Sequence, residues 1–432
     1  MTASVTMRAS ATSDEQTARV RAAVTRLVGD GGYLNAKIEE IAPEARISCT
    51  TFYDLYGDKE ACFLDAHASL AAELRERFAH ALNRVEPESA TRASLGALVG
   101  FALERPQAFA VLGHEALVAG PSAVASRAGL LDALSLALDE AVTDTNGTAR
   151  VPDIPSRVLI GGWIRALAMS LRRAVPAPDA LVEDLDTWAL AYDVPARARR
   201  YASALEDAAR ARRRPAPVQV EPAPVPRGRH GLSPSLIARV QRERLIFATA
   251  AAVHSRGYER TSVADIVATA GVSREVFYTQ FASKRDAYAA ALRLFLESSV
   301  GALAGVYFAP STGWSEQLWH TLGALLEFFA AHASFARAAL VETYAIDAKG
   351  TLTDDFVMGF ATFLHGGWTP PAEPPSPAQS AAMIGAALEA IGIWVAAERA
   401  EQLVHLRPLI AYTLLAPLAG AREAGDFVQS RA

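Results

Sequence analysis

The chain has 432 residues, of which 51% are hydrophobic and 21% are charged, and it carries a formal net charge of -5 at pH 7. A chain of this length is expected to form at least two domains, because one domain usually holds roughly 100 to 200 residues. Its two cysteines, Cys49 and Cys62, and its polar first residues argue against a disulfide-stabilised secreted protein and indicate a reduced, cytoplasmic setting. No run approaches the roughly 18 uninterrupted apolar residues of a membrane-spanning helix, so we expect no membrane partner.

The same residue pattern occurs twice along the chain, and this repeat decides the domain organisation. Gly32-Tyr33 begins the first copy, and the residues that follow it are Ile41, Ala45, Ser48, Phe52, Tyr53 and Lys59. Gly257-Tyr258 begins the second copy, followed by Ile266, Ala270, Ser273, Phe277, Tyr278 and Lys284. Every residue of the second set lies 225 positions after its counterpart, so the copies align without a gap. Duplication and fusion is the simplest account.

A proline-rich stretch, residues 212–226, separates the two copies. Its prolines lack a backbone N–H and favour extended conformation, which indicates an exposed, semi-rigid linker. The chain is therefore expected to divide near residues 211–231 into two units of similar size.

Apolar residues outside the linker recur at helical spacing. Val263, Ile266, Val267 and Ala270 lie at i, i+3, i+4 and i+7, on one face of a short helix. Longer helices are expected at residues 58–83, 91–104, 129–141, 155–174 and 181–192 of the first copy, and at 286–306, 316–331, 380–399 and 403–418 of the second. Because strand signals are absent, the expected fold class is all-α.

A second short helix, Arg274 to Phe281, is expected directly after the first one in the second copy. Thr261 and Ser273 precede the two helices at positions where a hydroxyl can cap a free backbone N–H. Gly271 ends the first helix, since glycine tolerates the left-handed backbone that a tight turn requires. Two short helices at this spacing are typical of a helix-turn-helix. Its apolar residues are expected to pack on the preceding helix: Ile266, Ala270, Val272, Phe277 and Phe281 against Leu245, Ala248 and Val253.

Basic residues gather just ahead of each copy, although the whole chain is acidic. They are Arg8, Arg19, Arg21 and Arg26 in the first, and Arg227, Arg229, Arg239, Arg242 and Arg244 in the second. Phosphate contact requires a local basic face, which these residues are expected to supply.

Residues 257–288, GYERTSVADIVATAGVSREVFYTQFASKRDAY, resemble the N-terminal signature of the TetR family of bacterial regulators. The resemblance implies that bases are approached by Ser273, Arg274, Glu275 and Thr279, and that phosphates are held by Thr261, Tyr278 and Lys284. It also implies an all-α fold of two tandem units, each with a helix-turn-helix head and a helical body. The corresponding ranges are 14–63 for the first head, 64–210 for its body, 211–231 for the linker, 232–288 for the second head and 289–432 for its body.

The first copy, residues 32–63, resembles the same signature but departs from it at three positions. Ala36 replaces the threonine expected to cap, Arg46 replaces the turn glycine, and Pro43 falls inside the first short helix, where it removes a hydrogen bond and costs about 3 kcal/mol. These departures leave two interpretations of this head open, a regular head and a distorted one. Its recognition helix still offers suitable DNA-contacting residues, namely Ser48, Cys49, Thr50, Thr51, Tyr53 and Lys59.

The two recognition helices read Ser-Cys-Thr-Thr and Ser-Arg-Glu-Val and so offer different hydrogen-bonding groups. Arginine suits guanine, glutamate accepts from cytosine, and threonine meets a thymine methyl. We therefore expect an imperfect palindrome with unlike half-sites, bound by a transcriptional regulator, a repressor by the family resemblance.

The remaining helices of TetR-like proteins form a small-molecule pocket and a dimer interface. The candidates for pairing are residues 155–174 with 181–192 and 380–399 with 403–418, which would make one chain a pseudo-dimer; pairing of two identical chains is the alternative. Candidate residues for an effector pocket are Phe109, His114, Glu115 and Trp163 in the first body, and Trp319, Phe328, Phe335, Glu342, Tyr344 and Trp394 in the second. Aromatics at helical spacing are more often core residues, and the effector's identity stays open.

No cofactor, metal site or enzyme activity is expected, because no motif pairs carboxylates, places a nucleophile beside a base, or spaces His and Cys for a metal. The alternative function is a ligand-binding or protein-interaction protein in which one or both heads have lost DNA affinity.

Overall fold

The computed structural model describes residues 2–143, 147–173, 178–211, 233–310, 313–340, 343, 346, 351–367 and 374–431. The chain folds into two compact units, residues 1–145 with 167–186 (unit 1) and residues 146–166 with 187–432 (unit 2). This division does not follow the linker, because unit 2 includes residues 146–166 and 187–211 of the first copy.

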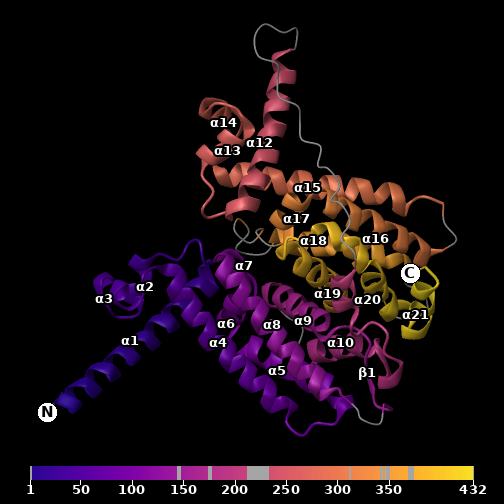
Figure 1. The fold of residues 1–432 in the computed structure, drawn as a ribbon, viewed down its shortest axis with the longest axis horizontal. Helices are drawn as coiled ribbons and strands as arrows, with labels where there is room; N and C mark the ends of the chain where they lie inside the picture. Colours follow the sequence, from indigo (N-terminus) through magenta and orange to yellow (C-terminus); the bar gives the residue numbers. More distant parts are fainter. Residues whose placement is uncertain are drawn as a thin grey trace. The chain divides into compact units, whose positions relative to one another are not determined.

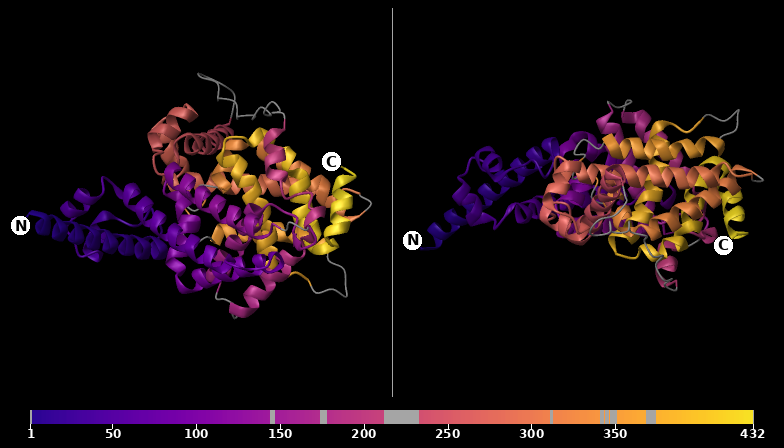
Figure 2. Two further views of the ribbon diagram at one scale, coloured as in Figure 1. Left: turned by 60° about the horizontal axis from the view of Figure 1, so that its bottom comes forward. Right: turned by 90° about the horizontal axis from the view of Figure 1, so that it is seen from above.

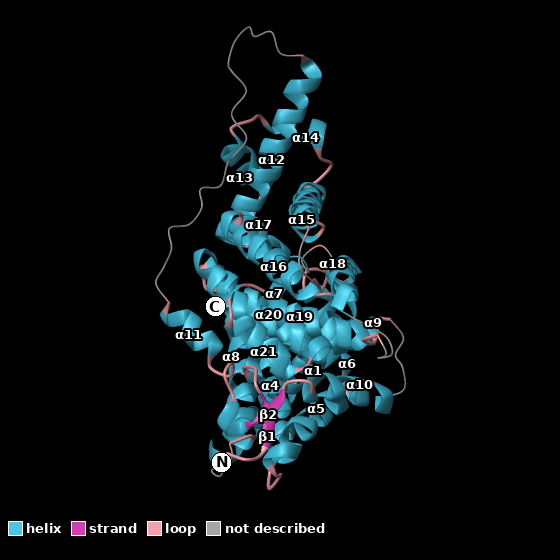
Figure 3. Ribbon diagram, turned by 90° about the vertical axis from the view of Figure 1, so that its right-hand side faces the viewer, coloured by secondary structure: helices cyan, strands magenta, loops and turns pink. Residues whose placement is uncertain are grey.

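Helices make up nearly all of the described secondary structure (Figure 3). In the first copy they are α1 (Thr2–Gly31), α2 (Ile38–Glu44), α3 (Cys49–Leu55), α4 (Lys59–Leu82), α5 (Pro87–Glu104), α6 (Pro106–Ala110), the π-helix η1 (Val111–Glu115), α7 (Ala116–Val118), α8 (Pro121–Ala141), α9 (Ser156–Arg172), α10 (Pro178–Leu190), the 3-10 turn η2 (Ala196–Ala198) and α11 (Ala204–Arg210). In the second copy they are α12 (Pro234–Arg256), α13 (Val263–Ala270), α14 (Arg274–Gln280), α15 (Lys284–Tyr307), α16 (Trp314–Ala331), α17 (Ala333–Leu340), α18 (Thr351–Ala361), η4 (Thr362–Gly367), α19 (Pro377–Ala396), η5 (Ala400–Leu406), α20 (Arg407–Ala419) and α21 (Ala421–Gln429). The all-α fold class is confirmed (Figure 1).

The 225-residue offset extends well beyond the motif. Helices α4 and α15 start at the aligned residues Lys59 and Lys284 and have the same length, 24 residues. Their N-caps are also aligned, since the side chain of Asp58 accepts from the Ala61 N–H and that of Ser283 from the Asp286 N–H. The sequence repeat therefore corresponds to a repeat of local structure.

Two expectations about secondary structure are wrong. A short antiparallel ribbon pairs β1 (Arg150–Pro152) with β2 (Asp193–Pro195), although no strand was expected. Strands of three residues are too short to show alternation, and these two are far apart in sequence. The helix expected at 403–418 is divided into η5 and α20, and Pro408 at the start of α20 fits this break because proline favours the first helical turn.

In unit 1, helix α4 lies at the centre and packs on α1, α5 and α8. Figure 2 shows α1 as a long rod that extends past the short helices α2 and α3. His67 of α4 is fully buried, and its Nδ1 lies 3.0 Å from the Ser126 hydroxyl of α8. Burial lowers the pKa of His67 to about 4, so this imidazole is neutral at physiological pH.

In unit 2, the first half of α9 packs closely on α19. A Cβ on Gly162 would lie 2.7 Å from the Ala382 carbonyl oxygen and 3.2 Å from the Ala386 Cβ, so only glycine permits this approach. Arg157 and Glu389 form a largely buried ion pair at 3.1 Å across the same contact. Residues 155–166, which belong to the first copy, are thus part of one core with the second.

The next contact of this core joins β2 and its flanking residues to the last helices. The buried Tyr192 donates its hydroxyl proton to the Thr413 carbonyl of α20 at 2.6 Å. Tyr201 stacks on Tyr412, with ring centroids 4.1 Å apart. These contacts join residues that follow α10 to α20 within unit 2.

Replacing Gly162 by alanine is expected to destabilise unit 2 by about 1–3 kcal/mol, because the added methyl group meets backbone that cannot move aside. Gly392→Ala on α19 is the control, since a Cβ there meets nothing within 4 Å. It should be neutral or stabilising by about 1 kcal/mol. Hydrogen exchange of α19 amides measures both, and equal effects of the two variants would contradict the close approach.

Two described helices, α15 and α19, are long and apolar enough to cross a membrane by length and composition alone, and the bent pair of residues 87–104 and 106–118 would add a third. Most of the apolar part of α19 is buried inside unit 2, which accounts for its composition.

Candidate nucleic-acid interface

The second head is a three-helix unit built from α12, α13 and α14 (Figure 1). Gly271 ends α13 in the left-handed conformation (φ 63°, ψ 38°), as its position in the turn predicts. Ser273 caps α14 by accepting from the Val276 N–H at 3.3 Å. The expected apolar residues are buried, with Val272 partly exposed, and include Leu245, Val253, Ile266, Ala270, Phe277 and Phe281.

The outward face of α14 carries the residues expected to approach DNA. Ser273, Arg274, Glu275 and Thr279 are all exposed, and Tyr278 is 50% exposed. The Arg274 guanidinium lies 5.9 Å from the Tyr278 ring centroid. A short helix whose first turn presents an arginine and a glutamate to solvent has the form of a helix that reads base edges in the major groove.

Thr261 does not have the place expected from sequence. The N-cap of α13 is Ser262, whose side chain and that of Asp265 form a reciprocal capping box. Thr261 is 2% exposed and donates its hydroxyl proton to the Gly257 carbonyl at 2.7 Å, so it holds the turn before α13. Because two adjacent residues carry a hydroxyl group, the sequence alone does not show which of them is the N-cap. Ala36 consequently replaces a buried turn residue, and Lys37 is the N-cap of α2.

Lys284 and Lys59, expected at phosphates, each hold the turn ahead of the first short helix. Lys284 donates from Nζ to the Tyr258 carbonyl at 2.7 Å and lies 4.3 Å from the Tyr258 ring centroid. Lys59 does the same with Tyr33, at 3.0 Å and 4.1 Å. Burial also lowers the pKa of Lys284. Both ammonium groups therefore position the head in this structure.

Several arginines of the expected basic face bind to groups within the heads. Arg19 donates to the Ala45 carbonyl, Arg26 pairs with Glu44, and Arg242 donates to the Gln280 carbonyl at the end of α14. These contacts position the short helices, so they correct the interpretation of the arginines as free phosphate contacts. Arg227 and Arg229 lie outside the described residues, as does the linker.

The first head has the same local geometry as the second despite its three departures. The N-caps of the recognition helices, Ser48 and Ser273, share the backbone angles φ -79° and ψ 158°. Ser48 accepts from the Thr51 N–H at 3.0 Å, and Pro43 is accommodated within α2. Cys49 and Thr50 are exposed, Thr51 is partly exposed, and Tyr53 is 55% exposed. The cap of this recognition helix is therefore not distorted.

Arg46 adopts the left-handed backbone that Gly271 adopts in the second head, with φ 57°. This conformation costs a residue with a Cβ roughly 1–2 kcal/mol. Arg46→Gly is therefore expected to stabilise the first head by about 0.5–1 kcal/mol, because glycine relieves the strain but loses more chain entropy on folding.

Hydrogen exchange of the α2 and α3 amides measures the effect of Arg46→Gly. Arg75→Gly, at an exposed position inside α4, is the control and should instead destabilise by about 1 kcal/mol. Faster exchange in Arg46→Gly would contradict the strain at this turn.

The end of α3 is held by charged groups that the second head lacks. Arg21 donates two hydrogen bonds to Asp65, at 2.7 and 2.8 Å, and the Tyr56 hydroxyl donates to the same carboxylate. Burial opposes ionisation of Asp65, but the hydrogen bonds from Arg21 and Tyr56 outweigh it and lower its pKa. In the second head Phe281 replaces Tyr56, and Arg242 lies over its ring at 4.3 Å.

The residues expected to form an effector pocket are mostly core residues. Phe109, Glu115, Trp163, Trp319, Phe335 and Trp394 are buried, whereas Glu342 and Tyr344 lie outside the described residues. Glu115 has a contact that the sequence did not reveal: its carboxylate accepts from the Tyr33 N–H at 2.6 Å, and His114 lies 3.2 Å from it. The π-helix η1 thus ties the first body to the turn of the first head.

Two cavities of the described part lie elsewhere. The larger has a volume of about 1080 Å³ in unit 2 and is lined by β1, β2 and the start of α21; a smaller one of about 310 Å³ lies beside Arg407. None of the effector-pocket candidates lines either of them. Among the described residues, no group of three or more His, Cys, Asp or Glu is placed to hold a metal ion.

Comparisons with known proteins found similar solved structures and one family match. A TetR-like transcriptional regulator from Rhodococcus sp. RHA1 is similar in structure, with 22% identity, a TM-score of 0.31, and coverage of 39% of this chain and 93% of that one. A TetR family transcription regulator from Marinobacter aquaeolei VT8 has 21% identity, a TM-score of 0.35, and coverage of 42% and 96%. No curated protein gives a significant sequence match. Residues 245–291, the core of the second head, match the family of bacterial regulatory proteins described as the tetR family.

Proposed function

We propose that this chain is a sequence-specific DNA-binding transcriptional regulator. The observation that carries the proposal is the exposed first turn of α14, where Ser273, Arg274 and Glu275 face solvent on a capped helix whose opposite side is buried through Phe277. The match of residues 245–291 to the tetR family supports the same function. A repressor is the form that the family resemblance favours.

The first head is proposed to bind DNA as well. Its recognition helix has the same cap geometry as α14 and exposes Cys49, Thr50 and Tyr53. Because the two helices present different side chains, the operator is an imperfect palindrome with unlike half-sites.

One chain is proposed to act as a pseudo-dimer. Support comes from unit 2, in which residues of both copies share one core through Gly162, the Arg157–Glu389 pair and Tyr192. Contacts of this kind between carboxyl-terminal helices would join two separate chains in a homodimer. Sedimentation of the protein on its operator, with one chain per site as the expected result and two chains as the contrary one, tests this point.

Release of DNA by a small-molecule effector is part of the proposal. The Glu115–Tyr33 hydrogen bond is a direct connection through which a change in the first body would reach the first head. An effector acts only if it favours one arrangement of the head over another.

Selection of bound sequences from random DNA tests the function. It should be done with the intact chain, with Arg274→Ala/Glu275→Ala and with Cys49→Ala/Thr50→Ala. Unlike half-sites, each lost in one variant, are the expected result, and binding should weaken steeply with salt. Enrichment of no sequence at any salt concentration would favour the alternative, a ligand-binding or protein-interaction protein with non-functional heads.

A further inference from the structure

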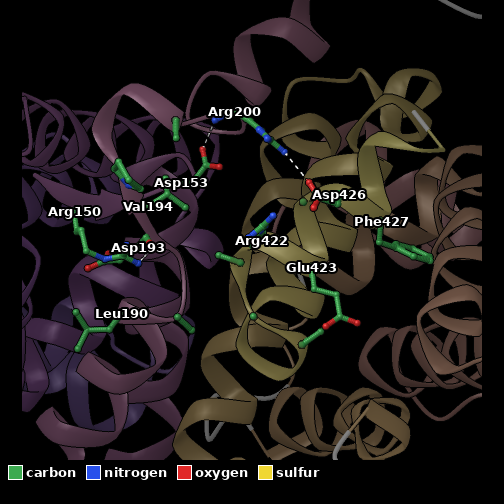
Figure 4. Close-up of a pocket in the computed structure, with 17 residues that line it drawn as sticks. Arg150, Asp153, Leu190, Asp193, Val194, Arg200, Arg422, Glu423, Asp426 and Phe427 are labelled. Carbon is green, nitrogen blue, oxygen red and sulfur yellow. Dashed lines mark hydrogen bonds and ion pairs between the residues drawn. The ribbon is translucent and has the colours of Figure 1, made fainter. Parts of the chain in front are cut away.

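One cavity of unit 2 lies beside the β-ribbon. Its walls come from two parts of the chain that are distant in sequence, residues 150–200 and residues 419–427. Figure 4 shows the two walls facing each other, with Arg150, Asp153, Leu190, Asp193 and Val194 on one, Glu423, Asp426 and Phe427 on the other, and Arg422 between them. A volume of about 1080 Å³ is sufficient for a drug-sized organic molecule.

Most acidic groups around the cavity already have partners. Asp153 is buried and its Oδ1 accepts from the N–H groups of Arg200 and Tyr201, at 2.5 and 2.8 Å. Asp426 pairs with the Arg200 guanidinium at 3.4 Å. The Glu423 carboxylate points away from the opposite wall in Figure 4. Asp153 and Asp426 are therefore engaged by groups of the protein itself.

Arg422 differs from the other cations of the cavity. Arg200 is held by Asp426, and Arg150 donates to the Asp193 carbonyl, whereas no hydrogen bond or ion pair within the described residues holds the Arg422 guanidinium. A guanidinium presents several N–H donors in a planar fork that matches a carboxylate or sulfonate. Arg422 is thus the group in this cavity that is available to an anion.

Apolar side chains line the rest of the wall. Leu190 is 49% exposed although it is a large apolar residue, and Val194, Pro195 and Phe427 line the same space. An apolar wall beside one free guanidinium is complementary to an organic anion with an apolar body.

We propose that this cavity is a binding site for an amphipathic organic acid, whose anionic group pairs with Arg422 and whose apolar body contacts Leu190 and Val194. The site lies within the predicted bodies, but none of the residues at which an effector was expected lines it. Binding of the acid in this cavity does not require DNA binding. The proposal therefore goes beyond the regulatory function and is tested independently of it.

Fluorescence titration of the full-length chain with anilinonaphthalene sulfonate, an aromatic sulfonate, tests the site. The expected result is one saturable site that Arg422→Glu weakens at least ten-fold, while Arg293→Glu, an exposed arginine of α15, stays within two-fold of the unchanged chain. Leu190→Ser should weaken binding, and Leu136→Ser, at a residue 60% exposed in unit 1, should not.

A cavity-filling variant covers the case in which charge reversal disturbs the fold. Ala198 is exposed on the cavity wall, so Ala198→Trp is expected to block the probe without disturbing the core. The proposal would be overturned if Arg422→Glu and Ala198→Trp bound the probe as tightly as the unchanged chain does. It would also be overturned if the unchanged chain showed no saturable binding.

Discussion

Replacing Arg274 and Glu275 together by alanine is expected to weaken specific DNA binding by about 30-fold or more. Both side chains are exposed on the first turn of α14, where they reach base edges if the helix enters the major groove. One well-placed contact to a base discriminates by roughly 1–3 kcal/mol, so the loss of two contacts, roughly 2–6 kcal/mol, weakens affinity by about 30-fold or more. Gel shift against the selected operator at a fixed salt concentration measures the effect.

Arg75→Ala/Glu76→Ala is a matched control for this double variant. These two residues form the same Arg-Glu pair, are likewise exposed, and lie on α4 in the first body. The control should bind the operator as the unchanged chain does. Specific binding that survives in Arg274→Ala/Glu275→Ala would remove α14 from base recognition.

Acidification from pH 7 to pH 4 is expected to destabilise unit 1 by about 3 kcal/mol through His67 alone. The folded-state pKa of His67 is about 4, which is below the ordinary value of 6.5 in the unfolded chain because the ring is buried. The stabilisation is complete above pH 6.5. It is lost as the pH falls, because the unfolded chain takes up a proton that the folded chain does not. Hydrogen exchange of the α4 and α8 amides across this range measures the loss.

The second copy suggests the control for this pH dependence. Leu292 occupies the position of His67 on α15 and is buried. The double variant His67→Leu/Ser126→Ala removes the titrating group and its hydroxyl partner together. The loss of stability of α4 between pH 7 and pH 4 should therefore be much smaller in this variant. An unchanged pH profile would show that other groups control the acid response of unit 1.

The fold class and the two heads could be predicted from sequence because they depend on local rules. Helical periodicity, a glycine in the turn and a serine before each recognition helix act over a few residues, and Ser48, Ser273 and Gly271 have the expected conformations. The predicted N-cap of α13 was wrong by one residue, because threonine and serine are both good N-caps and the sequence does not show that Thr261 is buried.

Features that depend on distant contacts could not be predicted. The β-ribbon joins Val151 to Val194, and the hydrogen bond of Glu115 reaches Tyr33; neither pairing has a local signal. The arginines ahead of the heads were predicted to form a basic face. In the folded head several of them are instead bound to carbonyl or carboxylate groups, as Arg19 is to the Ala45 carbonyl. The large cavity belongs to this class too, since residues 150–200 and 419–427 line it together.

The constant offset of 225 residues also has a genetic consequence. In an oligomer of identical subunits, every codon change appears in both reading helices at once, so recognition can drift only along symmetric sequences. Here a mutation in the codon for Cys49 leaves that for Arg274 untouched. If both heads bind DNA as proposed, each of these helices can therefore change its sequence preference by single mutations while the other still binds its half-site.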